Sequence, residues 1–556
     1  MTIKLTRRAL ITAMPAMAAV GILSACGGGD DDDNTVTTPA NPNDTALKFD
    51  PATYTTVNVT LDGAALKVRQ YRVVYVAKPI KMTSLTDPYA YQTLIISVAE
   101  ALAGDQTKPM YLVVNNSGWL ASAVATTITE GKAFVSTSDT DAIGSALKAG
   151  FVVVNIGTRS RGLRAADGRW AGKAPAPVVD TKAAIRYLRL NDSTLPGTTN
   201  RIILTGTSGG GGLTSAVAAS GNSADFLPFL ADIGAAGIAG SGATATSTIK
   251  DDVFAAVAYC PINNLGNADA GYEWEYNATR TDTNTGALNS VAYSAGPQVA
   301  ASAAIAATFP AYLSGLGLTR EDGAALTSAN LRDATQAFVR KEIEAQLAKG
   351  TAVPAFGASF TVSGQQYLND WLTLTGSGTS AKVASIDYAK YLAFITKIRA
   401  LKTVVAFDAV GVTGNPNISG ESTLFGSDYF EYSNFTEWSW ANNKVKGDGS
   451  GTDDTGLAWD AYLASASNNL ATQLKLINPI AYLNTAADSA PYWYVRHGMI
   501  DRDTSFAMQT LLYYAIKKDT SVKDVDFKIP YLVPHSGNYD VQEAFTWIKA
   551  KLASAG

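Results

Sequence analysis

One serine of this 556-residue chain has the sequence context of a nucleophile. Ser208 lies in Gly206-Thr-Ser-Gly-Gly210, the only Gly-x-Ser-x-Gly of the chain, between an apolar run, Ile202 to Leu204, and a run of small residues, Leu213 to Ala219. A strand, a sharp turn and a helix in that order expose a serine hydroxyl above a sheet, and glycines tolerate the strained backbone of such a turn. The pattern predicts a nucleophile elbow; a glycine-rich phosphate loop or a flexible turn is the alternative.

A serine hydroxyl needs a general base, and the base needs a carboxylate that orients it. The chain has only two histidines, and His535 follows its last apolar strand pattern. Asp501 and Asp503 follow an earlier strand pattern, so the chain order is serine, acid, histidine, as in α/β-hydrolases. His497 is the rival base, but it lies on the strand side of Asp501 and is expected to order the turn. Spacing alone does not choose between the two aspartates.

An oxyanion hole is the third requirement of this chemistry, because negative charge develops on the carbonyl oxygen. The amide of Gly209, directly after the serine, is expected to supply one donor. The second is expected from the loop after an earlier strand, Asn115-Asn-Ser-Gly-Trp119, which makes the Gly118 amide the candidate. An ordinary strand-end turn is the alternative interpretation of that loop.

The elements around these residues alternate between strand-like and helix-like patterns. Such an alternation predicts an α/β fold with a mostly parallel sheet, and helix, strand, serine turn, helix is the order that an α/β-hydrolase fold needs. The expected strands are Gln70–Val76, Gln92–Ala99, Met110–Asn115, Phe151–Ile156 and Val253–Cys260, and the expected helices are Thr140–Lys148 and Pro177–Leu190.

The alternation stops near Pro261 and resumes near Pro491. A long insertion between core strands is usually a lid over the catalytic residue. We therefore expect the hydrolase core in two parts, residues 47–261 and 481–556, with an inserted lid domain at 262–480. Within these parts the patterns predict helices at Pro297–Leu313, Leu331–Ala348 and Tyr388–Leu401, a surface loop at Gly447–Gly456, and strands at Tyr492–Val495 and Phe527–Val533.

The amino terminus has the pattern of an export signal. Basic residues precede an apolar stretch that ends in Leu23-Ser-Ala-Cys26, which resembles a bacterial lipobox. We expect a signal peptide at 1–26, a lipid on Cys26 that anchors the exported protein to the cell envelope, on either membrane face, and a flexible tether at 27–46. Ordinary cleavage and secretion is the alternative, and Thr6-Arg-Arg8 leaves Sec and twin-arginine export both open.

Composition excludes several other functions. The 44 basic residues are slightly outnumbered by 48 acidic ones and form no basic run, so no nucleic-acid partner is expected. Two cysteines cannot build a disulfide framework, and Cys260 is interpreted as a small core side chain. Two histidines make a histidine-rich zinc site improbable. We expect neither a metal nor a cofactor.

Several blocks in order resemble the bacterial tannase family, α/β-hydrolases that cleave galloyl esters. The resemblance extends from about residue 68 to 550. Its most specific blocks, besides the elbow, are Gly172-Lys-Ala-Pro-Ala-Pro-Val-Val-Asp-Thr-Lys-Ala-Ala-Ile-Arg-Tyr187, Ala258-Tyr-Cys-Pro-Ile262 with Ala268-Asp-Ala-Gly-Tyr-Glu-Trp274, and Arg496-His-Gly-Met-Ile-Asp-Arg-Asp-Thr-Ser-Phe506.

The resemblance implies roles for individual residues. Asp501 matches the triad acid, and Asp503, Lys402 and Glu421 match residues that bind the phenolic hydroxyls of the galloyl ring. Two carboxylates and one ammonium can satisfy three hydroxyls while rejecting rings that lack them. Two departures concern the oxyanion hole: Gly209 stands where the family has alanine, and Ser117-Gly-Trp119 replaces Gly-Gly-Tyr.

The expected protein is a serine esterase of galloyl esters, whose partners are a small phenolic ester and, through its lipid, a membrane. A feruloyl or general aryl carboxylesterase on the same fold is the first alternative. A non-catalytic, surface-anchored binding protein is the second, and the presence of serine, acid and histidine argues against it.

Overall fold

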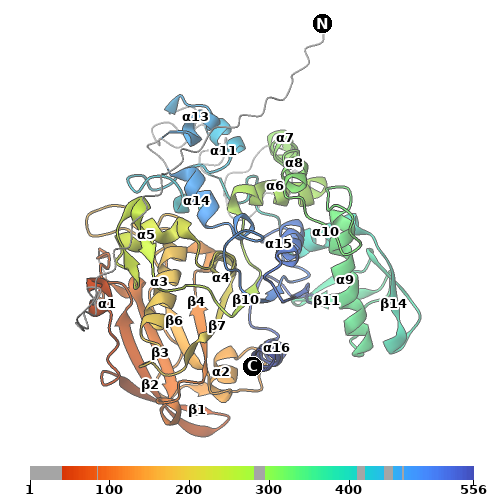
Figure 1. Cartoon of the computed structure of the whole chain (residues 1–556). Coiled ribbons are helices and arrows are strands. Elements are labelled where there is room, and N and C mark those ends of the chain that lie inside the picture. Colours follow the sequence, from red (N-terminus) through yellow and green to blue (C-terminus); the bar gives the residue numbers. More distant parts are fainter. Residues whose placement is uncertain are drawn as a thin grey trace, which may run out of the picture. The chain divides into compact units, whose positions relative to one another are not determined.

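A ten-stranded sheet runs through the described part of the chain (Figure 1). The structure is a computed structural model that describes residues 41–83, 86–280, 295–409, 420–443, 455–465 and 469–555. The strand order is β16-β15-β10-β7-β4-β6-β3-β2-β1-β5. Neighbours from β6 to β16 are parallel, whereas β3, β2 and β1 pair antiparallel. The predicted α/β-hydrolase fold with a mostly parallel sheet is confirmed.

The central parallel strands β4, β6, β10 and β15 are short and buried on both faces. Buried strands of this kind need cover from both sides, which crossover helices provide. The strands of the sheet are β1 (Thr55–Leu61), β2 (Ala64–Val74), β3 (Thr93–Ala99), β4 (Pro109–Val114), β5 (Ala133–Phe134), β6 (Val152–Ile156), β7 (Thr198–Thr207), β10 (Ala255–Tyr259), β15 (Tyr492–Arg496) and β16 (Asp524–Lys528).

Alternating strand residues divide the core into two clusters. In β4, Met110 and Leu112 pack with the cluster that contains α3 and α4, whereas Tyr111 packs with the cluster of α2 and α16. The period of two in a strand causes this division. The helices of the core are α2 (Ala142–Lys148), α3 (Ala176–Leu190), α4 (Gly209–Ala219), α5 (Leu227–Asp232), α15 (Phe506–Lys518) and α16 (Val541–Ser554), with a short hairpin of β8 (Ile238–Ala239) and β9 (Thr246–Ser247).

The described part of the lid segment, residues 262–480, consists of helices and two small hairpins. Figure 1 shows α11 and α13 at one end of it and α9, α10 and β14 at the other. Its described elements are α6 (Leu265–Tyr276), α7 (Ala295–Ala306), α8 (Phe309–Gly315), α9 (Leu331–Ala348), β11 (Ser359–Val362), β12 (Gln365–Leu368), β13 (Leu372–Thr375), β14 (Lys382–Ile386), α10 (Tyr388–Ile398), η8 (Glu421–Leu424), α11 (Glu437–Asn442), α13 (Trp459–Leu463) and α14 (Leu470–Leu476).

The carboxyl ends of the parallel strands carry the loops that matter for function. These ends meet at one edge of an α/β sheet, where ligands usually bind. Loops after β4, β6, β7, β15 and β16 therefore converge, although the first and the last of them lie more than 400 residues apart along the chain. The sheet topology, and not local sequence, brings the candidate residues together.

Some element boundaries differ from expectation. The last strand ends at Lys528, not at Val533, because Pro530 has no amide for a strand ladder. The helix expected at 297–313 is two helices, α7 and α8, separated at Ala307 and Thr308 before Pro310. The end of the expected tether is ordered: helix α1 (Pro42–Ala46) is fixed by a hydrogen bond from the Gly237 amide to Asp44 Oδ1, 2.7 Å.

The predicted signal peptide, Cys26, tether residues 27–40 and most of the loop at 447–456 lie outside the described residues. The domain boundaries at 261 and 481 stay predictions. Within the described ranges, no helix combines the length and apolar character that membrane crossing requires.

Candidate active site

Three side chains from three loops form a hydrogen-bonded relay. Ser208 Oγ lies 2.8 Å from His535 Nε2, and His535 Nδ1 lies 2.8 Å from Asp501 Oδ2. The serine follows β7, the aspartate follows β15 and the histidine follows β16. This is the geometry in which an imidazole can take a proton from the serine while a carboxylate holds its tautomer.

The elbow is strained, as a nucleophile turn requires. Ser208 has φ 61° and ψ −122°, which a non-glycine residue adopts only when its surroundings enforce it. The Ser208 amide donates to Tyr259 O at 2.9 Å, and the Ser208 carbonyl accepts the amide of Ile262 at 3.0 Å. Both partners lie at the end of β10, so the neighbouring strand fixes the turn.

The structure distinguishes the two candidate aspartates. Asp501 is fully buried, and its Oδ2 is 2.8 Å from His535 Nδ1, whereas Asp503 Oδ2 is 3.9 Å from the same nitrogen. The Asp503 amide donates to Asp501 Oδ1 at 2.8 Å, so one carboxylate orders the turn that carries the other. Asp501 therefore occupies the acid position.

His497 is far less suited to be the base. It is fully buried, packs edge-on against Phe506, and its Nδ1 lies 3.4 Å from Asp501 Oδ2. Burial lowers its pKa, which keeps the ring neutral. Both rings approach the same oxygen, Asp501 Oδ2, but it is His535 that contacts Ser208. The turn-ordering role expected for His497 stays a prediction.

Electrostatics favours the charged form of the relay histidine. Burial alone would lower the pKa of His535, but the charge of Asp501 and its hydrogen bond outweigh burial and raise that pKa above 6.5. For Asp501, burial would raise the pKa, yet the two histidines and the amide of Asp503 lower it. The pair thus stabilises an imidazolium, the species that forms when serine loses its proton.

The two expected oxyanion donors lie next to each other. Gly209 begins α4, so its amide is among the first-turn amides that have no partner within a helix, at the positive end of the dipole. Gly118 adopts φ 54° in the loop after β4, and the amide of Leu120 fixes the adjoining peptide by donating to Ser117 O at 3.0 Å. The loop and the helix start are in direct contact.

That contact explains the glycine at position 209. A Cβ on Gly209 would lie 2.1 Å from Trp119 N and 2.4 Å from Asn116 O. An alanine fits there only if the loop moves, so the glycine at position 209 and the path of the Ser117-Gly-Trp119 loop depend on each other.

Trp119 has a structural role. Its side chain is fully buried and its Nε1 donates to Ile262 O at 2.9 Å. A Cβ on Gly212 would lie only 2.8 Å from Cζ2 of the indole. It ties the loop after β4 to α4 and to the end of β10, and it forms no wall of an open pocket.

The three residues expected to bind phenolic hydroxyls lie in one charged cluster. Burial lowers the pKa of Lys402, and the charges of Glu421 and Asp503 oppose that effect. Lys402 Nζ also lies 4.0 Å from the centre of the Phe407 ring. Asp503 connects this cluster to the relay through its position beside His535.

Arg161, near the start of the loop after β6, is a further residue at the site that the sequence did not reveal. Its Nε donates to Gly118 O, and its guanidinium lies against Gly420, where a Cβ would meet Nη2 at 2.3 Å. Burial lowers the pKa of Arg161, and the charge of Glu421 raises it. Arg161 therefore links the oxyanion loop to the charged cluster. No local motif marks it.

Buried charges from the sequence blocks hold these loops. Asp180 accepts the Arg159 amide at 2.8 Å and pairs with its guanidinium at 2.8 Å, which fixes the loop of Arg161. Lys173 Nζ donates to three carbonyls of the segment around Glu421, those of Thr423, Phe425 and Glu431. Asp180 and Lys173, from the most specific sequence blocks, thus hold the loops that carry Arg161 and Glu421.

A second set of buried groups holds Lys402. Asp269 accepts the amides of Phe407 and Asp408 at 2.9 and 3.0 Å, and burial followed by the charge of Asp408 raises its pKa to about 7. Arg280 pairs with Glu273 and donates to Lys402 O at 2.6 Å. Helix α6 carries Asp269 and Glu273, so it orients the lysine.

Cys260 is a free thiol beside the relay. Its Sγ lies 3.3 Å from Ser536 O and 3.8 Å from His535 Nε2, and burial raises its pKa. Cys260, Asp501 and His535 could offer a metal three ligand atoms within 4.8 Å of one another. Both nitrogens of His535 already have hydrogen-bond partners, so a metal there would compete with the relay.

Comparison with known proteins gives consistent matches. The family model described as BD-FAE matches residues 103–300. A solved tannin acyl hydrolase in complex with ethyl gallate is 31% identical with a TM-score of 0.71, and the match covers 91% of this chain and 98% of that one. A tannase from Lactobacillus plantarum (30%, TM-score 0.69, 91% and 99% covered) and the Fusobacterium nucleatum tannase (29%, 0.69, 91% and 99%) are similar too. No curated protein sequence matches.

Replacing the relay carboxylate should change both rate and pH dependence. The base must be neutral, so kcat/KM rises with pH through the pKa of His535, and Asp501 raises that pKa. Asp501→Asn should therefore lower kcat about 10⁴-fold and move the rising limb to lower pH. Rate–pH profiles with an activated aryl ester measure both effects. A larger loss of kcat in Asp503→Asn would assign the acid to Asp503 instead.

Adding one methyl group at the elbow should disturb the oxyanion loop. The Cβ in Gly209→Ala would overlap Trp119 N and Asn116 O, so the loop must shift and kcat should fall about 10²-fold. Steady-state kinetics with a circular-dichroism check of folding tests this. Gly104→Ala, where nothing lies within 4 Å, is the matched control. Full activity of the Gly209 variant would contradict the coupling.

Proposed function

We propose that this chain, which belongs to the tannase-like α/β-hydrolases and is a carboxylic ester hydrolase, hydrolyses galloyl esters. Ser208, His535 and Asp501 are its proposed catalytic triad. One observation carries the proposal: the hydrogen-bonded relay lies beside a cluster of Lys402, Glu421 and Asp503. The 31% identical tannin acyl hydrolase in complex with ethyl gallate supports the choice of substrate.

In the first half of the reaction, Ser208 Oγ attacks the ester carbonyl carbon and its proton moves to His535 Nε2. Asp501 stabilises the imidazolium through Nδ1–H. The carbonyl oxygen becomes an oxyanion, which the amides of Gly118 and Gly209 bind. When the tetrahedral intermediate collapses, His535 gives its proton to the departing alcohol, and the acyl group stays on the serine.

In the second half, water attacks the acyl-serine and His535 takes its proton. Collapse of the second intermediate returns that proton to Ser208 Oγ and releases the free acid. The chemistry needs donors, a base and an acid, all supplied by side chains and amides of this chain, and no cofactor enters the steps.

Selectivity for a galloyl ring follows from three polar groups at fixed positions. Glu421 and Asp503 accept hydrogen bonds from phenolic hydroxyls, and Lys402 donates to a hydroxyl oxygen. A ring without those hydroxyls would displace water from these polar groups and give no hydrogen bonds in return, which costs about 1–3 kcal/mol for each group. Arg399 and Arg502 donate to the two Asp503 oxygens at 2.9 and 2.8 Å, which keeps that carboxylate in one orientation.

Ser208→Ala tests the nucleophile. It should abolish turnover of methyl gallate and prevent labelling by a fluorophosphonate, because no other described residue lies 2.8 Å from His535 Nε2. Mass spectrometry of the labelled wild-type protein locates the modified peptide. If the wild-type protein is labelled but hydrolyses no ester in a panel, the esterase function is contradicted. Undiminished turnover by the Ser208→Ala variant would exclude Ser208 as the nucleophile.

Glu421→Gln and Asp503→Asn test the phenol contacts. Each change keeps the shape of the side chain and removes one charge, so kcat/KM for methyl gallate should fall about 10- to 100-fold, mostly through KM. Activity on methyl ferulate should fall much less, since that ring carries a methoxy group and one hydroxyl. Equal losses on both esters would favour a general aryl esterase, the alternative on this fold.

The lipid anchor is part of the same proposal. Leu23-Ser-Ala-Cys26 is its sequence basis, and Cys26 and Cys260 are the only cysteines. In a bacterial host, Cys26→Ser should shift the protein from membrane to soluble fractions and abolish incorporation of a radiolabelled fatty acid. Cys260→Ser should retain both, which makes it the matched control. Membrane retention of the Cys26 variant would exclude the anchor.

A further inference from the structure

A cavity of about 660 Å³ lies among the helices of the lid segment and is called the lid cavity below. Its lining comes from α6, the end of α7, and the helices α11, α13 and α14 with the turns beside them. Apart from Ala481, every lining residue belongs to the lid segment. The volume is within the range of small-molecule sites, roughly 300–1,000 Å³.

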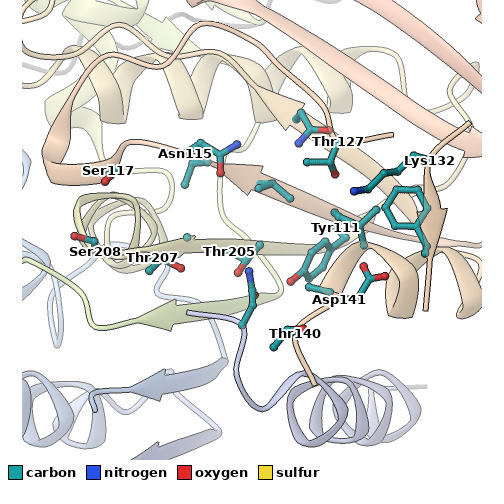
Figure 2. A pocket seen from close by; sticks show the side chains of 18 of the residues that line it. Tyr111, Asn115, Ser117, Thr127, Lys132, Thr140, Asp141, Thr205, Thr207 and Ser208 are labelled. Carbon is teal, nitrogen blue, oxygen red and sulfur yellow. The ribbon is translucent and has the colours of Figure 1, made fainter. Parts of the chain in front are cut away.

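The lid cavity is distinct from the cavity beside the relay serine. Figure 2 shows Ser208 and Ser117 at one end of that other cavity and Lys132 at its far end. All residues around it belong to the hydrolase core, and none of them lines the lid cavity. A molecule in the lid cavity therefore leaves the core cavity open to an ester.

The floor of the lid cavity is apolar. Ile305 and Val405 are buried there, in an apolar cluster separate from the two clusters of the sheet. Trp438 packs against this cluster and also lines the cavity. Phe435 and Trp459 add two more rings to the lining. Aromatic walls of this kind favour a flat ring, which they contact face to face or edge to face.

Four residues of the lining carry hydrogen-bonding atoms that are free to meet a ligand. In the described part of the chain, the indole N–H groups of Trp438 and Trp459 have no acceptor, and the side-chain oxygens of Asn267 and Asn442 accept no hydrogen bond. None of the four is a buried atom without a partner, so each is accessible. Two donors and two acceptors suit hydroxyl groups, which both donate and accept.

The charges of the lining favour a neutral ligand. Lys475 Nζ is paired with Asp225 at 2.7 Å, and Asp269 accepts two amides of the segment that carries Lys402. The carboxylate of Glu437 is exposed and has no basic partner among the described residues. An anionic ligand would meet this carboxylate with no free cation to balance it.

We propose that the lid cavity is a non-catalytic binding site for a neutral phenolic ring. The unsubstituted edge of such a ring packs on the apolar floor, and its hydroxyls meet the accessible indole and amide groups, which lie on half-buried residues nearer to solvent. A sugar carries hydroxyls around its whole ring and would bury some of them against Ile305 and Val405 without partners. The inference does not depend on the reaction at Ser208.

Equilibrium dialysis of methyl gallate against the full-length Ser208→Ala protein, which should turn over no ester, tests this site. Two molecules should bind, one at the charged cluster and one in the lid cavity. Ala441→Trp fills the cavity from an exposed position on α11, and Trp438→Leu removes an aromatic wall. Each should raise the Kd of the lid site about tenfold or more. Glu421→Gln should weaken only the other site.

Ala345→Trp is the matched control. Ala345 is exposed on the lid helix α9 and does not line the cavity, so both molecules should still bind with the Kd values of the parent protein. Binding at the second site that is unchanged in Ala441→Trp and in a folded Trp438→Leu protein would overturn the proposal. An equally large loss in the control would overturn it too.

Two further probes test the class of ligand. Methyl benzoate has the same ring and ester without hydroxyls, so it should bind the lid site about tenfold more weakly than methyl gallate. Equal affinities would refute recognition of the hydroxyls. If methyl α-glucoside binds more tightly than methyl gallate and loses its binding in Ala441→Trp, the cavity is a sugar site and the phenolic ring is the wrong occupant.

Failure of the proposed function gives a different pattern of binding. A single bound molecule that is lost in Ala441→Trp and retained in Glu421→Gln would refute the phenol contacts beside the relay and support the lid site. A single molecule with the opposite pattern would refute the lid site and leave the proposed function intact.

Discussion

The hydrogen bond between His535 and Asp501 depends on the whole central sheet. The two residues lie on loops after adjacent parallel strands, β15 and β16, and Ser208 follows β7, two strands away. A displacement of one strand by a single residue would break a 2.8 Å contact and turn side chains to the other face. Strand register, enforced by the two apolar clusters, therefore fixes the relay. The imidazolium needs this rigidity, because its stabilisation by Asp501 decreases steeply with distance.

Close backbone contacts impose a second constraint around the serine. The start of α4 approaches the loop after β4 so closely that Gly209 has no room for a methyl group, and Trp119 is inserted beneath that loop. Helix propensity disfavours four consecutive glycines. Packing overrides propensity here, since a Cβ on Gly212 would lie 2.0 Å from Ile262 O. The poor helix formers let the start of α4 approach the loop after β4 and the chain at Ile262 this closely.

The relay was predictable because its evidence is local: one Gly-x-Ser-x-Gly, two histidines and a fixed chain order. The fold class followed from alternating patterns, and α9 has the expected ends, Leu331 and Ala348. Arg161 was not predictable, since it acquires its role through partners distant in sequence, Gly118 and Gly420. The end of β16 was misplaced because an apolar run continues past Pro530 into a turn.

The charged residues around the relay divide into those that hold the loops and those that are proposed to contact substrate. Asp180, Lys173 and Asp269 are buried and satisfied by protein groups, so they are structural despite belonging to the most specific blocks. Removing one partner of such a pair would leave an uncompensated charge, at a cost of about 3–5 kcal/mol. Lys402, Glu421 and Asp503 are also largely buried, but their charges face one another across the site. On the proposed function, the hydroxyls of a phenolic ring pair with these charges, which ties selectivity to the same electrostatics that orients Asp503 beside His535.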